Sequence, residues 1–138
     1  MKTTAVDSNI LIDIASADPA HGSHSRAALE SCAREGSLII SPEVVAEFAS
    51  GCASVAEALA IVKALTIEYV DIGEVNAAKA GEVRGRKRRG GRVIADYMIA
   101  MHAAVHADRL LTRDADFTRM NVPGLVVVTP ENIFNRNP

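Results

Sequence analysis

The chain has 138 residues, of which 49% are hydrophobic and only 4% aromatic, and its formal net charge is −2. This length and apolar content fit a single domain over residues 1–138, with a sizeable core and no room for a second domain. No apolar run approaches the roughly 20 residues of a membrane-spanning helix, and Met1–Thr4 leads into a strand rather than a signal peptide. We therefore expect a soluble, cytoplasmic protein with no membrane partner.

The first third of the chain predicts two strands separated by helices. Thr4–Val6 is a short apolar run typical of a buried strand, and a short helix follows through Ile10–Ile12. Residues 25–34 have helical periodicity, and Gly36 is placed to end that helix in a left-handed conformation. Leu38–Ile40 is the second predicted strand.

Helix-start signals organise the middle of the chain. Ser41–Glu43 has the pattern of an N-cap, a first-turn proline and an acid near the positive helix end, which predicts a helix that carries Glu47 on its inner surface. Ser54–Glu57 is a capping-box pattern in front of a helix over Ala58–Leu65. Ile67–Val70 is the third predicted strand.

The same alternation continues to the end of the chain. Glu74–Lys87 predicts a helix broken by Gly90–Gly91, and Val93–Val105 predicts another. Leu110–Thr112 and Leu125–Val128 are continuously apolar, as expected for strands covered by helices on both faces. The sequence therefore predicts an α/β/α sandwich around a central, mostly parallel sheet of about five strands.

Four acids fall where this architecture would bring them together. Asp7 and Asp114 directly follow predicted strands, while Glu47 and Asp96 lie on predicted helices. Sites in parallel sheets form outside the carboxyl ends of the strands, so all four side chains are expected at one crevice. Any one of them also fits a plain capping role, because Asp oxygens accept backbone N–H groups at helix starts. Carboxylates about 4 Å apart repel by roughly 4 kcal/mol at an effective dielectric of 20, so the cluster needs a counter-cation or takes up protons.

The candidate ligands favour a hard cation. Oxygen donors of this kind favour Mg²⁺, with Mn²⁺ able to substitute, over Zn²⁺. His102 and His106 have the spacing of a zinc pair but are turned away from the face of Asp96 on a helix. Cys32 and Cys52 lack C-x-x-C spacing and are expected to be free thiols.

Basic residues gather in the segment 84–92, which holds six of the 15 Lys and Arg residues and no acid. One interpretation is an RNA-binding rim, whose phosphate contacts would supply affinity and salt dependence without base specificity. The other is a solvated helix end, because cations also favour the carboxyl terminus of a helix. The six residues are Arg84, Arg86, Lys87, Arg88, Arg89 and Arg92.

Four short motifs follow one another along nearly the whole chain: Asp7–Leu11, Val45–Phe48, Asp96–Ala100 and Leu111–Phe117. In this order they resemble the motifs of the PIN-domain nucleases, and most closely those of the VapC toxins of bacterial and archaeal toxin–antitoxin pairs. The resemblance implies a PIN-like fold and a Mg²⁺- or Mn²⁺-dependent endoribonuclease that hydrolyses RNA phosphodiester bonds through metal-activated water. It also implies homodimers and a VapB-type antitoxin that inserts a segment into the pocket and joins it to a DNA-binding dimer.

The resemblance also implies roles for individual residues. Asn9 and Thr112 match accessory polar positions. Asp114 is favoured over Asp116 as the fourth acid because it lies closer to the strand end. The implied catalytic acids are Asp7, Glu47, Asp96 and Asp114, and the implied metal ligands are Asp7, Asp96, Asp114 and Asp116.

Two alternatives stay open. One is a phosphotransfer enzyme with Asp7 as the nucleophile, although Asp7–Asn9 lacks the second acid of the D-x-D motif. The other is a noncatalytic PIN-like binding module, in which the acids hold a structural cation or an arginine of a partner and the chain acts as a co-regulator with a DNA-binding protein. No histidine is placed near the acids, so cleavage through a histidine base and the RNA 2′-hydroxyl is not expected.

Overall fold

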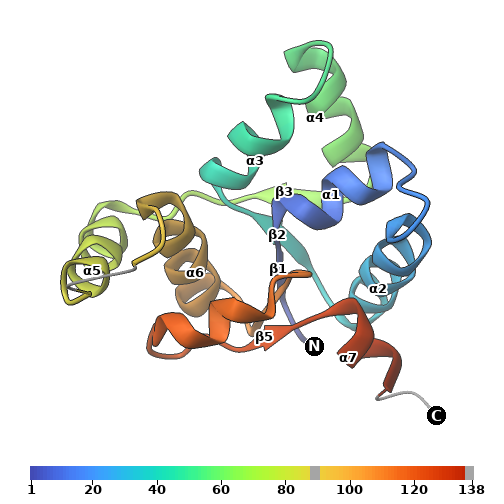
Figure 1. The fold of residues 1–138 in the computed structure, drawn as a ribbon. Coiled ribbons are helices and arrows are strands. Elements are labelled where there is room, and N and C mark those ends of the chain that lie inside the picture. The colour runs from blue at the N-terminus through green and yellow to red at the C-terminus, as the bar shows by residue number, and fades with distance from the viewer. Residues whose placement is uncertain (88–90, 136–138) are drawn as a thin grey trace.

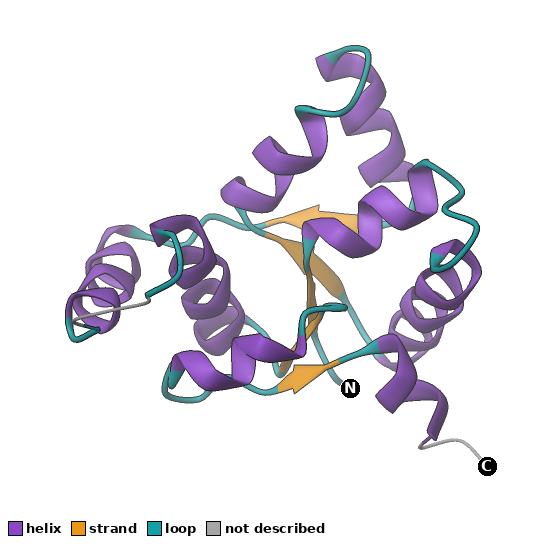
Figure 2. Cartoon of the chain, viewed as in Figure 1, coloured by secondary structure: helices purple, strands orange, loops and turns teal. Residues whose placement is uncertain are grey.

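A five-stranded sheet forms the centre of the computed structural model, which describes residues 1–87 and 91–135 (Figures 1 and 2). Every strand pairing is parallel, and the order across the sheet is β3-β2-β1-β4-β5. The predicted α/β fold with a central parallel sheet is confirmed. The strands are β1 (Thr4–Val6), β2 (Leu38–Ile40), β3 (Ile67–Tyr69), β4 (Arg109–Leu111) and β5 (Val127–Val128).

Helices cover both faces of this sheet. Figure 1 shows α5 and α6 together on one side and α2 and α7 on the other. None of the helices in the described residues is long and apolar enough to cross a membrane. The helices are α1 (Ser8–Ala15), α2 (Gly22–Glu35), α3 (Pro42–Ala49), α4 (Val55–Ala64), α5 (Glu74–Gly85), α6 (Ile94–His106), the 3₁₀ helix η1 (Ala115–Met120) and α7 (Pro130–Asn135).

The sheet order creates a switch point between β1 and β4. From β1 the chain adds β2 and β3 on one side, and it then crosses back to add β4 and β5 on the other. Val6 pairs with Leu111 at the carboxyl ends of β1 and β4, and both side chains are buried. Crevices at such switch points are the usual ligand sites of open parallel sheets, so the residues that follow β1 and β4 are placed to form a site.

The predicted caps of the middle helices are confirmed. Ser41 Oγ accepts the Val44 N–H at 3.2 Å, and Pro42 opens α3. Ser54 Oγ accepts the Glu57 N–H at 3.1 Å at the start of α4. These bonds satisfy N–H groups that a helix start leaves without partners, and the Ser41 cap fixes where α3 leaves the end of β2.

Strand β4 begins at an arginine, which apolar patterning did not predict. The Arg109 side chain is buried, and it has two hydrogen-bond partners there. Its Nε donates to Thr4 Oγ1 at 2.9 Å, and its Nη2 donates to Glu35 Oε2 at 3.1 Å. These partners replace the hydrogen bonds to water that the guanidinium loses on burial. The predicted Leu125–Val128 strand is shorter than expected, since only Val127–Val128 joins the sheet.

Gly36 does not adopt the left-handed conformation that its position after α2 predicted. Its φ of 167° and ψ of −158° are extended. A Cβ at this position would lie 2.1 Å from the carbonyl oxygen of Lys2. The backbone N–H of Lys2 also donates a hydrogen bond to the Glu35 carbonyl oxygen, next to Gly36. The glycine is therefore explained by a close approach of the two backbones and not by a positive φ. The predicted break at Gly90 lies outside the described residues.

Candidate functional site

A hydrogen-bond network joins the carboxyl ends of β1 and β4. Thr112 Oγ1 donates to Asp7 Oδ2 at 2.7 Å and accepts the Asp114 N–H at 3.0 Å. Asn9 Nδ2 lies 3.2 Å from Thr112 Oγ1 and 3.4 Å from Asp7 Oδ2, and Asn9 Oδ1 accepts the Arg113 N–H at 3.1 Å. The two residues expected to be accessory, Asn9 and Thr112, thus connect the acids that follow the two strands.

Asp7 combines a capping role with an electrostatically unfavourable position. Its Oδ1 accepts the Ser8 N–H at 2.7 Å, so it is the N-cap of α1. The residue is only 5% exposed, and burial raises the pKa of its carboxyl group. Hydrogen bonds from Thr112 and Ser8 oppose this rise, while the negative charges of Asp96 and Asp114 add to it. Asp7 therefore responds to the other acids of the cluster.

Glu47 lies at the edge of the site and not on the inner surface of α3. Val44 and Phe48 are buried, whereas Glu47 is exposed, so the expectation that all three face inward was wrong for the acid. Its Oε1 accepts a 3.1 Å hydrogen bond from Ser8 Oγ, which places it beside Asp7. Partial desolvation is the main cause of the raised pKa of Glu47, and the charge of Asp7 adds to it.

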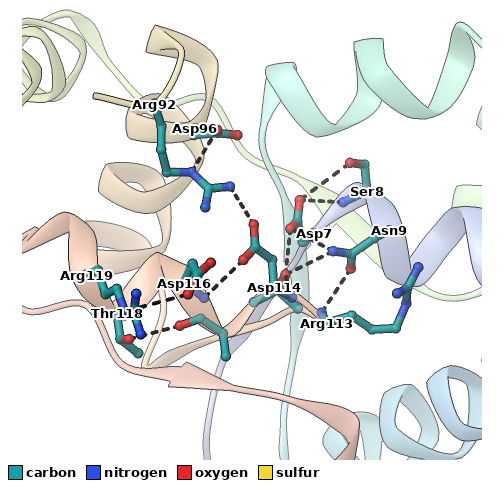
Figure 3. Close-up of polar contacts among 12 residues, drawn as sticks. Asp7, Ser8, Asn9, Arg92, Asp96, Arg113, Asp114, Asp116, Thr118 and Arg119 are labelled. Atoms are coloured by element: carbon teal, nitrogen blue, oxygen red, sulfur yellow. Dashed lines mark hydrogen bonds and ion pairs between the residues drawn. The ribbon is translucent and has the colours of Figure 1, made fainter. Parts of the chain in front are cut away.

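Arg92 lies between Asp96 and Asp114 (Figure 3). Its Nε donates to Asp96 Oδ2 at 2.9 Å, and its Nη2 donates to Asp114 Oδ2 at 2.5 Å. The guanidinium carbon is 4.6 Å from the centre of the Phe117 ring, a cation–π arrangement. Hydrogen bonding from Arg92 holds the pKa of Asp114 below its usual value. Arg92, which is also one of the residues expected on an RNA-binding rim, thus neutralises part of the acidic cluster.

Asp114 and Asp116 take different positions. Asp114 contacts Arg92 with Oδ2, while its Oδ1 accepts the Asp116 N–H at 3.0 Å and so caps η1. The Asp116 carboxylate lies 3.7 Å from Arg119 Nε in an exposed pair, as Figure 3 shows. Arg92 therefore pairs with Asp114 and Asp96 and not with Asp116.

The described residues of the basic segment differ in their contacts. Arg84 Nε donates to the Arg92 carbonyl oxygen at 2.7 Å, and Arg86 forms an exposed i, i+4 pair with Glu82 at 3.0 Å. Lys87 and Arg92 line a cavity of about 270 Å³ together with Arg119 and Asp116. Arg88 and Arg89 lie outside the described residues.

The sequence matches a known family over most of its length. A family model for the PIN domain matches residues 4–123. The chain belongs to the PIN-domain family. No match was found among curated proteins.

Solved structures with the same fold are similar to this PIN domain over nearly its whole length. VapBC2 from Rickettsia felis, bound to a DNA fragment from its promoter, has 22% identity and a TM-score of 0.70, covering 92% of this chain and 98% of that chain. FitAcB from Neisseria gonorrhoeae has 21% identity and a TM-score of 0.66, covering 93% and 98%. Mycobacterium tuberculosis VapC20, described as a sarcin-ricin loop cleaving toxin, has 15% identity and a TM-score of 0.68, covering 88% and 97%. At these identities the matches show a shared fold.

Sequence reasoning missed an ion pair between Arg113 and the buried Asp13, beside this site. Arg113 Nε and Nη2 donate to the two carboxylate oxygens of Asp13 at 2.6 and 3.1 Å, and Ser25 Oγ donates to Asp13 Oδ2 at 2.7 Å. The Asp13 side chain is only 3% exposed. The available signal was an acid inside the apolar run Ile10–Ile14, because an acid placed among core residues needs a charged partner. The pair fixes Arg113, which lies between Thr112 and Asp114.

The two histidines of α6 have a structural explanation. His102 Nε2 lies 2.8 Å from the Val70 carbonyl oxygen, and His106 Nε2 lies 3.1 Å from the Ile72 carbonyl oxygen. Burial lowers the pKa of His102. The pair therefore holds the connection between β3 and α5 against α6, which gives no support to a zinc site. Cys32 and Cys52 carry free thiols, as expected.

The donor set of the site suits Mg²⁺ or Mn²⁺ in kind. Asp7, Asp96 and Asp114 offer carboxylate oxygens, and two of them already bind a cationic group in Arg92. Among the described residues, however, no three His, Cys, Asp or Glu side chains are close enough to hold a metal ion as they stand.

Proposed function

We propose that this PIN domain is a metal-dependent endoribonuclease that acts as the toxin of a type II toxin–antitoxin pair. The observation that carries the proposal is the convergence of Asp7, Asp96 and Asp114 at the switch point between β1 and β4, where a cationic side chain already lies against two of the three acids. Membership of the PIN-domain family and the description of VapC20 as a sarcin-ricin loop cleaving toxin support the nuclease reaction.

In this proposal the aspartates bind the metal ion and Glu47 transfers a proton. Asp7, Asp96 and Asp114 bind Mg²⁺ or Mn²⁺, and Asp116 is a reserve ligand. A bound metal ion would neutralise the nonbridging phosphate oxygens and supply an acidified water for direct attack on phosphorus. Glu47, at the edge of the site, takes up the proton of the attacking water, for which its raised pKa is favourable.

Two residues of the network would keep Asp7 in position for this chemistry. Thr112 Oγ1 and Asn9 Nδ2 both contact Asp7 Oδ2, which leaves the carboxylate little freedom to rotate. Asp7 Oδ1 is held in turn by the Ser8 N–H. A carboxylate that is fixed before the metal arrives loses less conformational entropy when it binds.

The RNA backbone would be held by cations next to the acids. Lys87 and Arg119 line the cavity of about 270 Å³ that also includes Asp116 and Arg92. Phosphates placed here would lie beside the metal ligands. The exposed Arg86 extends this rim along α5, whereas Arg84 stabilises the segment by binding the Arg92 carbonyl.

We also propose that the chain forms homodimers and pairs with a VapB-type antitoxin that carries the DNA-binding function. The observation that supports the antitoxin is that similar structures are described as complexes bound to DNA: VapBC2 with a promoter fragment and FitAB with an IR36 fragment. An antitoxin segment with an arginine would find in Asp96 and Asp114 two carboxylates that accept a guanidinium in the geometry seen here.

A second candidate function is a noncatalytic PIN-like binding module. It is favoured by the structural roles that the acids already have: Asp7 caps α1, Asp114 caps η1, and Arg92 neutralises Asp96 and Asp114. Such a module would bind its partner equally well as the Asp7→Asn variant and would not cleave RNA.

The test is cleavage of end-labelled structured RNA by the purified chain with Mg²⁺, with Mn²⁺ and with EDTA. Asp96→Asn is run in parallel, and Glu68→Gln, an exposed carboxyl-to-amide change on β3, is the matched control. The proposal requires metal-dependent cutting by the wild type and by Glu68→Gln, products with 5′-phosphate and 3′-hydroxyl ends, and loss of cutting by Asp96→Asn. Cyclic phosphate ends, or cutting by Asp96→Asn at the wild-type rate, would overturn it.

A further inference from the structure

Arg92 occupies one carboxylate oxygen on each of two proposed metal ligands. Asp96 Oδ2 accepts from Arg92 Nε, and Asp114 Oδ2 accepts from Arg92 Nη2 (Figure 3). Both carboxylates belong to the proposed metal-ligand set, so the chain supplies its own cation at that place. An oxygen engaged by a guanidinium N–H must give up that hydrogen bond, or share its charge, before it can coordinate a metal ion.

Neighbouring groups hold Arg92 in this position. Its guanidinium lies over the ring of Phe117, which is buried, and its backbone carbonyl accepts from Arg84 Nε at 2.7 Å. Gly91 allows Arg84 to approach, since a Cβ at Gly91 would lie 2.9 Å from Arg84 Cζ. The Arg92–Asp96 pair also has i, i+4 spacing at the start of α6. The position of the Arg92 side chain is therefore fixed by two carboxylates, an aromatic ring and a hydrogen bond to its backbone carbonyl.

A divalent ion and this guanidinium cannot share the two carboxylates without cost. Both are positive, both bind the carboxylates of Asp96 and Asp114, and the Arg92 side chain is largely shielded from water, with 29% of it exposed. A long arginine side chain can swing away while its backbone stays anchored, and an RNA phosphate in the cavity that Arg92 lines would offer it another anion.

We propose that Arg92 is a built-in counter-cation that stabilises the metal-free site and that Mg²⁺ must displace it from Asp96 and Asp114, which frees the guanidinium for an RNA phosphate. This inference rests on the metal site of the proposed function but not on RNA cleavage. It predicts that metal affinity is limited by a residue that is not a ligand.

The test measures metal binding directly, by the electron paramagnetic resonance signal of free Mn²⁺ and by calorimetric titration with Mg²⁺. Arg92→Ala is compared with Arg86→Ala, which removes one charge from the same segment but pairs with Glu82 and touches none of the acids. Losing two charge-assisted hydrogen bonds that compete with the metal is expected to tighten Mn²⁺ binding by about tenfold or more in Arg92→Ala. Arg86→Ala is expected to stay within about twofold of the wild type.

Arg92→Lys provides a second variant that keeps the charge and loses the planar fork, and its Mn²⁺ affinity is expected between those of the wild type and Arg92→Ala. In the wild type, Mg²⁺ addition is expected to shift the Arg92 Nε–Hε signal in an amide-region NMR spectrum. Equal or weaker Mn²⁺ binding by both Arg92 variants, with wild-type circular dichroism, would overturn the inference.

The outcomes separate this inference from the proposed function. Metal-dependent RNA cutting by the wild type, together with unchanged metal affinity in the Arg92 variants, would support the proposed nuclease function. The same result would overturn the proposal that the metal ion displaces Arg92. Tighter metal binding by Arg92→Ala, without RNA cutting by the wild type, would support the displacement of Arg92 by the metal ion and overturn the nuclease function. Failure of both the wild type and Arg92→Ala to bind Mn²⁺ overturns both.

Discussion

Thr112 Oγ1 donates a 2.7 Å hydrogen bond to Asp7 Oδ2, although the two residues are 105 positions apart in the chain. The bond exists because β1 and β4 are paired with Val6 opposite Leu111, so the residues that follow the two strands meet. It supports the charged form of an acid whose carboxyl group is otherwise disfavoured by burial. The proton equilibrium of Asp7 therefore depends on a hydroxyl from a distant segment.

Removing that hydroxyl should change the pH dependence of metal binding. A protonated carboxyl is a poor metal ligand, so Mn²⁺ affinity falls as pH drops through the pKa of Asp7, which lies above 3.8. Thr112→Val removes a hydrogen bond that lowers this pKa, so the loss of affinity should begin at higher pH than in the wild type. Mn²⁺ titrations between pH 4 and pH 7 check this. Thr112→Ser keeps the hydroxyl and should follow the wild type, and identical curves for all three proteins would contradict the prediction.

The ion pair between Arg92 and Asp114 should contribute stability that disappears in acid. Arg92 lowers the folded-state pKa of Asp114, so its contribution is present above the unfolded value of 3.8 and is lost as pH falls through the folded pKa. Because both side chains keep partial solvent contact, we expect Arg92→Ala to lose about 0.5–1 kcal/mol at pH 7 in EDTA. Urea unfolding of the wild type and the variant should converge towards pH 3. A difference in the free energy of unfolding that stays constant from pH 7 to pH 3 would show that the Arg92–Asp114 ion pair is not its source.

The ion pair of Arg113 with the buried Asp13 should matter more for stability than a nearby pair in which both side chains are exposed. Arg113→Ala leaves the Asp13 carboxylate buried with Ser25 as its remaining hydrogen-bond donor, which should cost about 1–3 kcal/mol. Arg119→Ala removes an exposed pair 3.7 Å from Asp116 and should change stability by less than about 0.5 kcal/mol. Denaturant melts of the two variants give the comparison directly, and equal losses would refute the ranking.

Two glycines should respond in opposite directions to alanine. Gly36→Ala forces a Cβ against the Lys2 carbonyl oxygen at 2.1 Å, so we expect a loss of about 1–3 kcal/mol. Gly81 lies inside α5, where an added Cβ meets nothing within 4 Å, so Gly81→Ala should stabilise by about 0.5–1 kcal/mol. Thermal melts of both variants test the signs. A stabilised Gly36→Ala would mean that the backbone contact at the start of β1 is not tight.

RNA affinity should depend on salt through the rim next to the acids. If Lys87 contacts one phosphate, Lys87→Ala should reduce the slope of log affinity against log salt by about 0.7 for a single strand. Lys63→Ala, an exposed lysine on α4, should leave the slope unchanged. Binding is measured with Asp96→Asn protein so that the RNA is not cut. Equal slopes for both lysine variants would remove Lys87 from the rim.

Much of the fold could be predicted because buried parallel strands are continuously apolar and helix starts carry local signals. Thr4–Val6 and Leu38–Ile40 form strands with the predicted bounds, and Ser41 and Ser54 cap the helices that follow them. β4 starts earlier than predicted because Arg109 is buried by partners from β1 and α2, which no local pattern reveals. Local signals report on a residue and its near neighbours, so they fail where a distant segment supplies the partner.

By itself, the sequence determined the alternation of strands and helices and placed acids after β1 and β4, since both are properties of short segments. Only the tertiary structure decided which charges meet. It paired Arg92 with Asp114 and Arg113 with Asp13, and it left Glu47 exposed beside Ser8. The physical reason is that an ion pair depends on distance in space, and the sheet order brings together segments that lie up to about 100 residues apart in the chain.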